Sequence, residues 1–299
     1  MHELPQTRDL AVFIAVVDDG GFAEAARRLN AAPSTLSRAV ARLEDQLRVT
    51  LLRRTTRSVD LTPEGRNLLE RAREIVDRTE SLRDLASRGR APGGPLRVNA
   101  PVPYVLHVIA PHLRKFHEIY PDIELTLDMT DSVVDLIGAH ADVAIRMGRL
   151  EDSDLIRRQV GRASWHLVAA PSYLDEAGWP ETPSDLVRLR QVRFQNPAHI
   201  NALEFRSHQG AVPVPASVIA GNGEAVRQLV LGGMGIARFS DFMVARDLAE
   251  GRLVELFPGE LTAPPLDISA VYLTRTSGLR RLAAFIDWLA SLQREERDS

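Results

Sequence analysis

Residues 22–47 read FAEAARRLNAAPSTLSRAVARLEDQL, and this stretch decides the fold of the amino-terminal part of the chain. Its first eight residues have the apolar spacing of a short helix, and residues 30–32 are predicted to form a tight turn. Pro33 suits the first turn of the next helix, where a missing N–H costs no hydrogen bond. The apolar face of that helix consists of Leu36, Val40, Leu43 and Leu47. The stretch therefore predicts two helices joined by a tight turn.

The flanking residues complete a larger module. Upstream, the apolar spacing between Leu10 and Val17 predicts a helix over about Thr7 to Asp18. Downstream, the segments 51–53 and 59–61 are predicted to pair as a small hairpin. Three helices and a hairpin in this order are typical of a winged helix-turn-helix, which places its third helix in the major groove of DNA. The alternative interpretation is a three-helix packing module without a DNA function.

The third helix and the hairpin carry side chains that suit DNA. Hydroxyls and arginines reach phosphates or base edges, and arginine pairs best with guanine. The predicted DNA contacts are Ser34, Thr35, Ser37, Arg38, Arg42, Arg53, Arg54, Thr56 and Arg57.

Positive charge gathers in the same region. From Gly20 to Arg57 the chain has eight arginines and three carboxylates, a net charge of +5, whereas the whole chain has a net charge of −3. A basic head on an acidic body favours binding of a polyanion. The alternative is a solvated, arginine-rich surface.

A long helix is predicted after the hairpin. Thr62 can cap it, Pro63 occupies its first position, and it runs to about Ser87. One stripe of this helix contains Leu68, Ala72, Ile75, Thr79, Leu82 and Leu85. Such a stripe on an otherwise charged helix predicts a partner helix and hence a dimer. The alternative is packing against the rest of its own chain.

The pattern changes after the Gly/Pro-rich linker at residues 89–95. Strands and helices then alternate, which predicts a largely parallel, doubly wound sheet. Strands are predicted at 96–98, 123–129, 142–146, 165–169, 192–194, 217–220, 235–239 and 268–273, and helices at 104–119, 133–139, 224–231 and 279–292.

An ordered set of these segments resembles the LysR-type transcriptional regulators. The head of that family is similar to FAEAARRL (22–29), STLSR (34–38), RLE (42–44), RTTR (54–57) and LTPEG (61–65). Its effector-binding domain is similar to VDL (134–136), DVAIRMG (142–148) and GGMGIA (232–237). The resemblance thus spans nearly the whole chain.

The resemblance implies an α/β multidomain fold: an N-terminal winged helix-turn-helix, a long linker helix and a C-terminal two-lobed, periplasmic-binding-protein-like α/β domain. We expect the DNA-binding domain at 1–62, the dimerisation helix at 63–88 and the effector-binding domain at 89–299. Lobe I would comprise about 95–162 and 268–299, and lobe II about 163–267. The implied partners are operator DNA, a small-molecule effector between the lobes and further copies of the chain, as dimers and tetramers. RNA polymerase is a further candidate partner.

Two positions depart from the family pattern. Ala32 stands where a capping Ser or Thr is usual, which removes a cap worth roughly 1 kcal/mol. Arg48 stands where glycine is usual after the recognition helix, so it is mildly strained if that position needs a positive φ. Both departures concern stability rather than DNA contact.

Effectors in open α/β sheets bind beyond the carboxyl ends of strands, near helix amino termini. The resemblance places several such edges around the cleft between the lobes. The predicted effector-binding residues are Pro101, Val102, Tyr104, Thr130, Arg146, Met147, Phe194, Asn222, Gly223, Arg238 and Phe239. The apolar stretch near Val102 favours an aromatic or largely apolar effector that bears one acidic group. Arg238 is interpreted either as an anion contact or as a solvated side chain.

Other chemistry is not predicted. The chain has no cysteine, and residues 1–5 lack the pattern of a signal peptide, so we expect a cytoplasmic protein without disulfides or a membrane segment. His107, His112 and His117 do not share a helix face, so we expect no metal, and we expect no cofactor. No catalytic motif is found, so we expect no enzyme. The predicted function is a sequence-specific DNA-binding regulator controlled by an effector; the alternative is a solute-binding protein without a DNA function.

Overall fold

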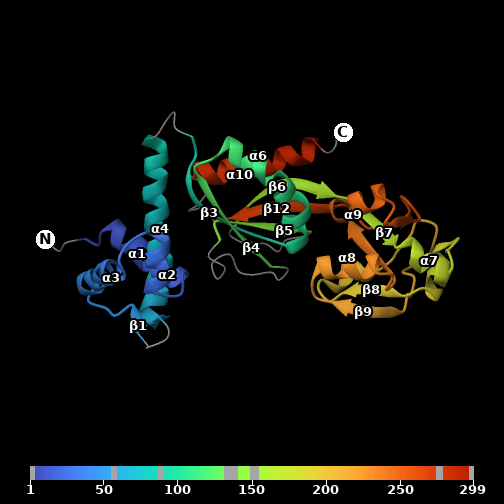
Figure 1. Ribbon diagram of the computed structural model, residues 1–299, viewed down its shortest axis with the longest axis horizontal. Coiled ribbons are helices and arrows are strands. Elements are labelled where there is room, and N and C mark those ends of the chain that lie inside the picture. Colours follow the sequence, from blue (N-terminus) through green and yellow to red (C-terminus); the bar gives the residue numbers. More distant parts are fainter. Residues whose placement is uncertain are drawn as a thin grey trace.

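The computed structural model describes residues 4–54, 59–86, 91–130, 141–148, 155–273 and 279–295. Figure 1 shows a small helical head at one end of the molecule, a long helix that runs through it across the long axis, and two α/β lobes that follow along that axis. No helix in the described ranges is both long enough and apolar enough to cross a membrane.

The head contains the three predicted helices and the hairpin. The helices are α1 (Thr7–Asp18), α2 (Phe22–Arg28) and α3 (Pro33–Leu47), and the antiparallel strands are β1 (Leu52–Arg54) and β2 (Val59–Leu61). Its core includes the fully buried side chains of Phe13, Leu36, Leu43 and Leu51. The winged helix-turn-helix is therefore confirmed. Thr56 and Arg57 lie outside the described residues, as does the side chain of Arg54.

The linker helix α4 (Pro63–Ala86) begins as predicted. The Thr62 hydroxyl accepts a hydrogen bond from the Gly65 amide at 2.9 Å, and a side chain at Gly65 would overlap the Leu51 carbonyl. The stripe on α4 divides in two. Ala72 is buried in the head, whereas Ile75 and Leu82 are 48% and 67% exposed. Packing against its own chain therefore applies to the Ala72 part of the stripe, and the dimer stays a prediction for the exposed part.

Lobe I is built on a five-stranded sheet with the order β4-β3-β5-β12-β6. Its strands are β3 (Gly94–Ala100), β4 (Ile123–Met129), β5 (Val143–Met147), β6 (Ile156–Ala163) and β12 (Leu266–Tyr272). One face is covered by α6 (Ala110–Ile119) and α10 (Arg280–Glu295), whose aromatic side chains Phe116, Phe285 and Trp288 pack together. A short helix, α5 (Val102–Tyr104), and a π-helical turn (Val105–Ile109) lead into α6. The predicted helix at 133–139 lies outside the described residues.

Lobe II has a second five-stranded sheet with the order β11-β7-β10-β8-β9. Its strands are β7 (Trp165–Ala169), β8 (Gln191–Phe194), β9 (Ala216–Ala220), β10 (Ile236–Ser240) and β11 (Val254–Leu256). Its helices are α7 (Pro171–Ala177), α8 (Gly223–Leu231) and α9 (Asp241–Ala249), with 3₁₀ turns at Pro183–Arg188 and Ala198–Asn201. Five of these elements, α7, α9, β11 and the two 3₁₀ turns, were not predicted.

The prediction of largely parallel sheets is wrong, because each sheet is mixed. β3 pairs in parallel with β4 and β5, but β12 is antiparallel to both β5 and β6. In lobe II, β8 is parallel to β9 and β10, but β7 is antiparallel to β10 and β11. The antiparallel strands are the ones that carry the chain between lobes, from β6 to β7 and from β11 to β12. The β-α-β rule applies to two strands of the same sheet that are joined by a helix. It does not fix the direction of a strand that the chain enters from another sheet.

Candidate DNA interface and effector site

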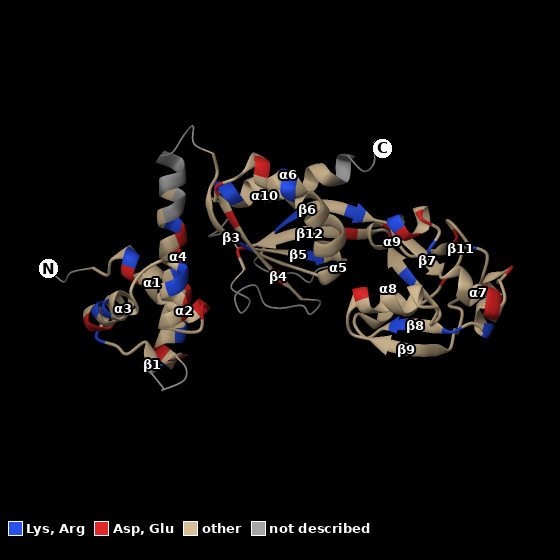
Figure 2. Cartoon of the chain, in the orientation of Figure 1, with Lys and Arg blue, Asp and Glu red and all other residues tan. Residues whose placement is uncertain are grey.

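The DNA-facing candidates on α3 share one exposed face. Ser34, Thr35, Arg38 and Arg42 are exposed and Ser37 is half-buried. Leu36, Val40 and Leu43 are buried on the opposite face and fix the orientation of the helix in the head. Figure 2 marks the positively charged positions of the head on α3 and near it. Arg53 is exposed on the wing strand β1.

The two arginines of α3 differ in what they contact. Nε and Nη2 of Arg42 donate to the Asp9 carboxylate at 3.1 and 2.7 Å, and Asp9 is only 1% exposed. Hydrogen bonding and charge from Asp9 raise the pKa of Arg42. Arg38 makes only a 3.3 Å hydrogen bond from Nε to the Ser34 carbonyl within the described chain. The terminal nitrogens of Arg38 therefore have no hydrogen-bond partner among the described residues, whereas Arg42 ties α3 to α1.

The two ends of α3 have the features expected from the departures of Ala32 and Arg48 from the family pattern. Ala32 at the N-cap supplies no side-chain hydrogen bond, and Arg48 at the C-cap has φ +54°, in the left-handed region. A contact that lies between the end of α3 and the wing was not predicted from the sequence. The Glu44 carboxylate accepts hydrogen bonds from the amides of Leu51 and Leu52 at 2.7 and 3.2 Å. Glu44 thus holds the start of the wing against the recognition helix.

A buried carboxylate joins the head to lobe I. Asp18, at the end of α1, accepts from Arg73 of α4 at 2.6 Å and from Arg97 of β3 at 2.8 Å. The side chains of Asp18 and Arg73 are almost completely buried. Because the three residues belong to three different parts of the chain, this network fixes the head, the linker helix and lobe I to one another.

The two lobes meet where two predicted edges come together. A Cβ at Gly223 of α8 would lie 2.9 Å from the Pro103 side chain and 3.5 Å from Phe194, so only glycine fits this approach. Asn222 caps α8 by accepting from the Ala225 amide at 3.1 Å. One helical turn beyond Pro103, His107 hydrogen-bonds the Glu224 carboxylate at 2.8 Å.

Glu224 continues into a charged cluster inside lobe II. It accepts from Arg227 at 2.7 Å, and Arg227 in turn donates to the fully buried Asp247 at 2.7 Å. Burial opposes ionisation of Glu224, but hydrogen bonds from His107 and Gln228 and the charge of Arg227 outweigh it, so the pKa of Glu224 is lowered.

The remaining effector candidates lie in different surroundings. Pro101, Val102, Phe194 and Asn222 are half-buried near the contact between lobes, and Met147 and Thr130 are half-buried at the ends of their strands in lobe I. Tyr104 and Phe239 are fully buried, and their rings pack edge to face on Phe242 and Phe194 at 5.6 and 5.7 Å. These two rings support the contact between lobes from within the core.

The two candidate arginines are both buried. Arg146, at the end of β5, donates to the Asn99 side chain at 2.7 Å, and burial lowers its pKa. Arg238 is 6% exposed, so its interpretation as a solvated side chain is wrong. Its guanidinium stacks 4.6 Å from the Trp165 ring centroid and donates to the carbonyls of His199 and Ala202 at 3.4 and 3.1 Å, and burial lowers its pKa to about 10.

Alternation along β10 separates Arg238 from the other candidates. Phe239 belongs to the apolar cluster under α8 and α9, whereas Ile236 belongs to the cluster on the opposite side of the sheet. Arg238 therefore points to the same side as Ile236, away from Phe194. The structure brings Pro101 to Tyr104 together with Phe194 and Gly223, but it does not bring Arg238 to them. In the described part of the chain, no cluster of His, Asp or Glu could hold a metal ion.

Two family models cover nearly the whole chain. Residues 7–66 match "Bacterial regulatory helix-turn-helix protein, lysR family", and residues 89–294 match "LysR substrate binding domain". The match of the head removes the alternative of a solute-binding protein without a DNA function.

Named relatives agree with these matches. The chain is 36% identical to the HTH-type transcriptional regulator CrgA of Neisseria meningitidis serogroup C over 95% of each chain, and 32% identical to DmlR of Escherichia coli over 97% of this chain and 95% of DmlR. The solved structure of CrgA superposes with a TM-score of 0.64 over 95% of this chain and 97% of CrgA. Full-length AphB of Vibrio cholerae, 27% identical, superposes with a TM-score of 0.59 over 96% of this chain and 99% of AphB.

Proposed function

The chain belongs to the LysR family of DNA-binding transcriptional regulators, and from that premise we propose that the exposed face of α3 reads an operator in the major groove. The observation that carries this proposal is the state of Arg38, which is exposed and has no carboxylate partner in the described chain. Ser34, Thr35 and Ser37 share that face, and Arg53, Arg54, Thr56 and Arg57 are proposed wing contacts. Arg42 is proposed to contact DNA only through the nitrogen that Asp9 leaves unoccupied.

We propose that α4 pairs with α4 of a second copy. The exposed Ile75 and Leu82 support this pairing, because apolar side chains on one stripe of an exposed helix are stabilised by a partner. The proposed units are 1–62 for DNA binding, 63–88 for dimerisation and 89–299 for the effector, with the lobe limits given above. A tetramer of two dimers and a contact with RNA polymerase on the promoter are the further proposals for assembly.

The effector is proposed to bind between the lobes. The half-buried side chains of Pro101, Val102 and Phe194 supply an apolar surface there, and Arg146 supplies a cation at the neighbouring strand end. We therefore propose an aromatic or largely apolar effector with one acidic group. Its binding would change the angle between lobes and, through the Asp18 network, the position of the heads on DNA. We propose that the protein catalyses no reaction and acts by binding DNA and an effector. Its proposed location is the cytoplasm, where bacterial operators lie.

The DNA-binding proposal is tested with the purified full chain and the DNA immediately upstream of its own gene. Binding is measured by gel shift against a scrambled duplex of equal length at physiological salt. The proposal predicts an operator preference of 10³-fold or more, on the order of that for specific regulators. A preference near one on this DNA and on sequences selected from a random library would contradict it.

The effector proposal is tested by thermal shift. Aromatic carboxylates, neutral aromatics, sugars and inorganic anions are compared at equal concentration. The proposal predicts that the largest rise in Tm comes from an aromatic carboxylate, because a ligand that binds only the folded state stabilises it by mass action. A rise caused only by sugars or inorganic ions would contradict it.

A further inference from the structure

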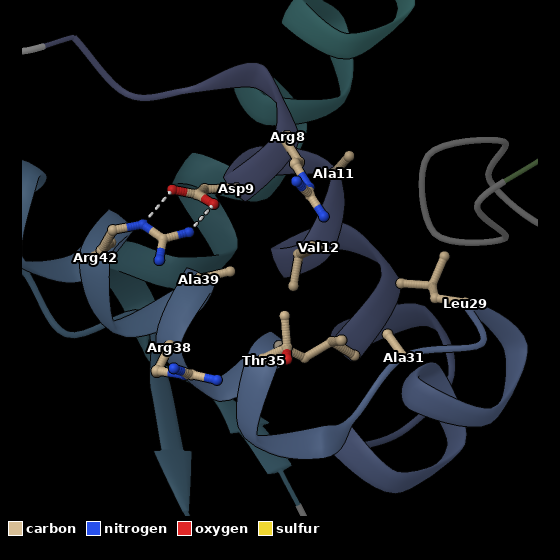
Figure 3. A pocket seen from close by; sticks show the side chains of 11 residues that line it. Arg8, Asp9, Ala11, Val12, Leu29, Ala31, Thr35, Arg38, Ala39 and Arg42 are labelled. Carbon is tan, nitrogen blue, oxygen red and sulfur yellow. Dashed lines mark hydrogen bonds and ion pairs between the residues drawn. The ribbon is translucent and has the colours of Figure 1, made fainter.

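A hollow lies between α1 and α3, on the same side of the head as the proposed DNA-reading face. Its volume is about 540 Å³. Figure 3 shows α1 on one side, α3 on another, and the end of α2 with the following turn closing the third. Its lining consists of Arg8, Asp9, Ala11, Val12, Leu29, Ala31, Thr35, Leu36, Arg38, Ala39 and Arg42.

The lining of the hollow carries a net positive charge. Three arginines face one carboxylate, and both oxygens of that carboxylate, Asp9, are bound by Arg42. Arg8 has no hydrogen bond or ion pair among the described residues, and Arg38 has none with a carboxylate. Two cationic side chains on the rim are therefore available to an anion.

The floor of the hollow is apolar, because Leu36 and Ala39 are buried there and Val12 is half-buried. Ala11, Leu29 and Ala31 are exposed apolar side chains of the same lining. An occupant that alternates apolar and anionic groups matches this surface better than a compact, fully hydrated anion. A sugar–phosphate strand has this alternation, since each deoxyribose lies between two phosphates.

The hollow is continuous with the recognition face, because Thr35, Arg38 and Arg42 belong to both. The major groove is about 12 Å wide, and a helix with its side chains is about 10–12 Å across, so an inserted helix meets a backbone strand along its flank. With α3 inserted, the flank that carries Thr35 and Arg38 faces α1 across the hollow.

We propose that the hollow holds one strand of the operator's sugar–phosphate backbone, with Arg8 of α1 as a phosphate contact on its outer wall. This inference rests on the proposed insertion of α3. It extends the DNA interface to a helix that neither the recognition motif nor the wing includes. Arg8 adds affinity without reading sequence, because a phosphate contact fixes register but carries no base information.

The test is Arg8→Ala in the full chain, measured by fluorescence anisotropy on operator and scrambled duplexes over a range of salt. Loss of one phosphate contact lowers the slope of log Kd against log[salt] by about 0.9, which corresponds to a loss in affinity of about fivefold at 0.15 M salt. The loss is expected to be equal on both duplexes. Arg8→Lys is expected to keep the wild-type slope.

Two further variants control for charge and for the hollow itself. Arg114→Ala removes the same charge from a side chain that is 90% exposed in lobe I and is expected to leave both affinities unchanged. Ala11→Phe adds a bulky side chain at an exposed position of the lining and is expected to weaken binding to both duplexes without lowering the Tm.

The outcomes separate this inference from the proposed function. If Arg38→Ala weakens operator binding but Arg8→Ala and Ala11→Phe match the wild type, the role of the hollow is overturned and the insertion of α3 stands. If Arg38→Ala also has no effect, the insertion of α3 is overturned as well. Unchanged DNA binding by Arg8→Ala with reduced transcription in a reconstituted assay would assign the hollow to a protein partner and overturn the proposal.

Discussion

Two arginines of the head and two arginines of lobe II lie in opposite surroundings. On the head, Arg8 and Arg38 project outward with no carboxylate partner in the described chain. In lobe II, Arg227 and Arg252 both donate to Asp247, and Arg227 also reaches Glu224. An arginine that lacks an internal partner is available to another molecule, whereas a buried and paired one holds its own chain together. The comparison therefore separates residues for binding from residues for support.

Asp247→Asn tests the supporting side of the comparison and has the largest expected effect. It would leave Arg227 buried beside a neutral amide, and breaking a buried pair in this way costs about 3 kcal/mol or more in the free energy of unfolding. Urea unfolding followed by circular dichroism measures this loss. Asp287→Asn, which breaks an exposed pair with Arg158, is the control and should cost less than about 1 kcal/mol. Equal losses of unfolding free energy in the two variants would contradict the distinction between buried and exposed arginine pairs.

Arg38→Ala tests the binding side. It is expected to weaken operator binding by about 1–3 kcal/mol and to reduce the preference over scrambled DNA, with no change in Tm. Anisotropy titrations and a melting curve measure the two quantities on the same preparation. A lower Tm with unchanged DNA affinity would show that Arg38 stabilises its own chain rather than binding DNA.

Arg97→Ala addresses the junction between the head and lobe I. Arg97 is partly exposed and shares the buried Asp18 with Arg73, so we expect a loss of about 1 kcal/mol in the free energy of unfolding. A double-mutant cycle with Asp18→Ala isolates the contact, and we expect the coupling energy to be of the same size. A coupling energy of zero would show that lobe I does not hold the head through this pair.

Glu224→Gln has the smallest expected effect and sharpens the comparison through pH. The pKa of Glu224 is lowered from its ordinary value of 4.5, so its ionised form stabilises the folded chain above that pH. This contribution is lost as the pH falls through the lowered value. The difference in unfolding free energy between wild type and variant should therefore be present at pH 7 and shrink toward pH 3. A difference that does not vary with pH would contradict this assignment.

The sequence predicted the head well because its signals are local. The boundaries of α1, the turn before Pro33 and the Thr62 cap each depend on residues a few positions apart. The positive φ of Arg48 was expected from the resemblance, which places glycine at that position. The strand directions were missed because they depend on where the chain crosses between lobes. Neighbouring residues do not encode that crossing.

The supporting contacts were missed for the same reason. His107 and Glu224 are 117 positions apart, and Asp18 and Arg97 are 79 apart. No periodicity links such pairs. Arg8 was missed because it lies in the first turn of α1, outside the helix-turn-helix motif, and shares a hollow with Thr35 and Arg38 only once α1 packs across α3. Arg238 was open to two interpretations until burial against Trp165 removed one of them.

The most direct test of the central claim is selection of duplexes from a random library by the wild-type chain and by Arg38→Ala. The claim is that Arg38, the exposed arginine of α3 with no carboxylate partner among the described residues, reads DNA. It predicts one enriched motif with the wild type and loss of a guanine preference at one position of that motif with the variant. Recovery of the same motif at the same strength by both proteins would contradict it.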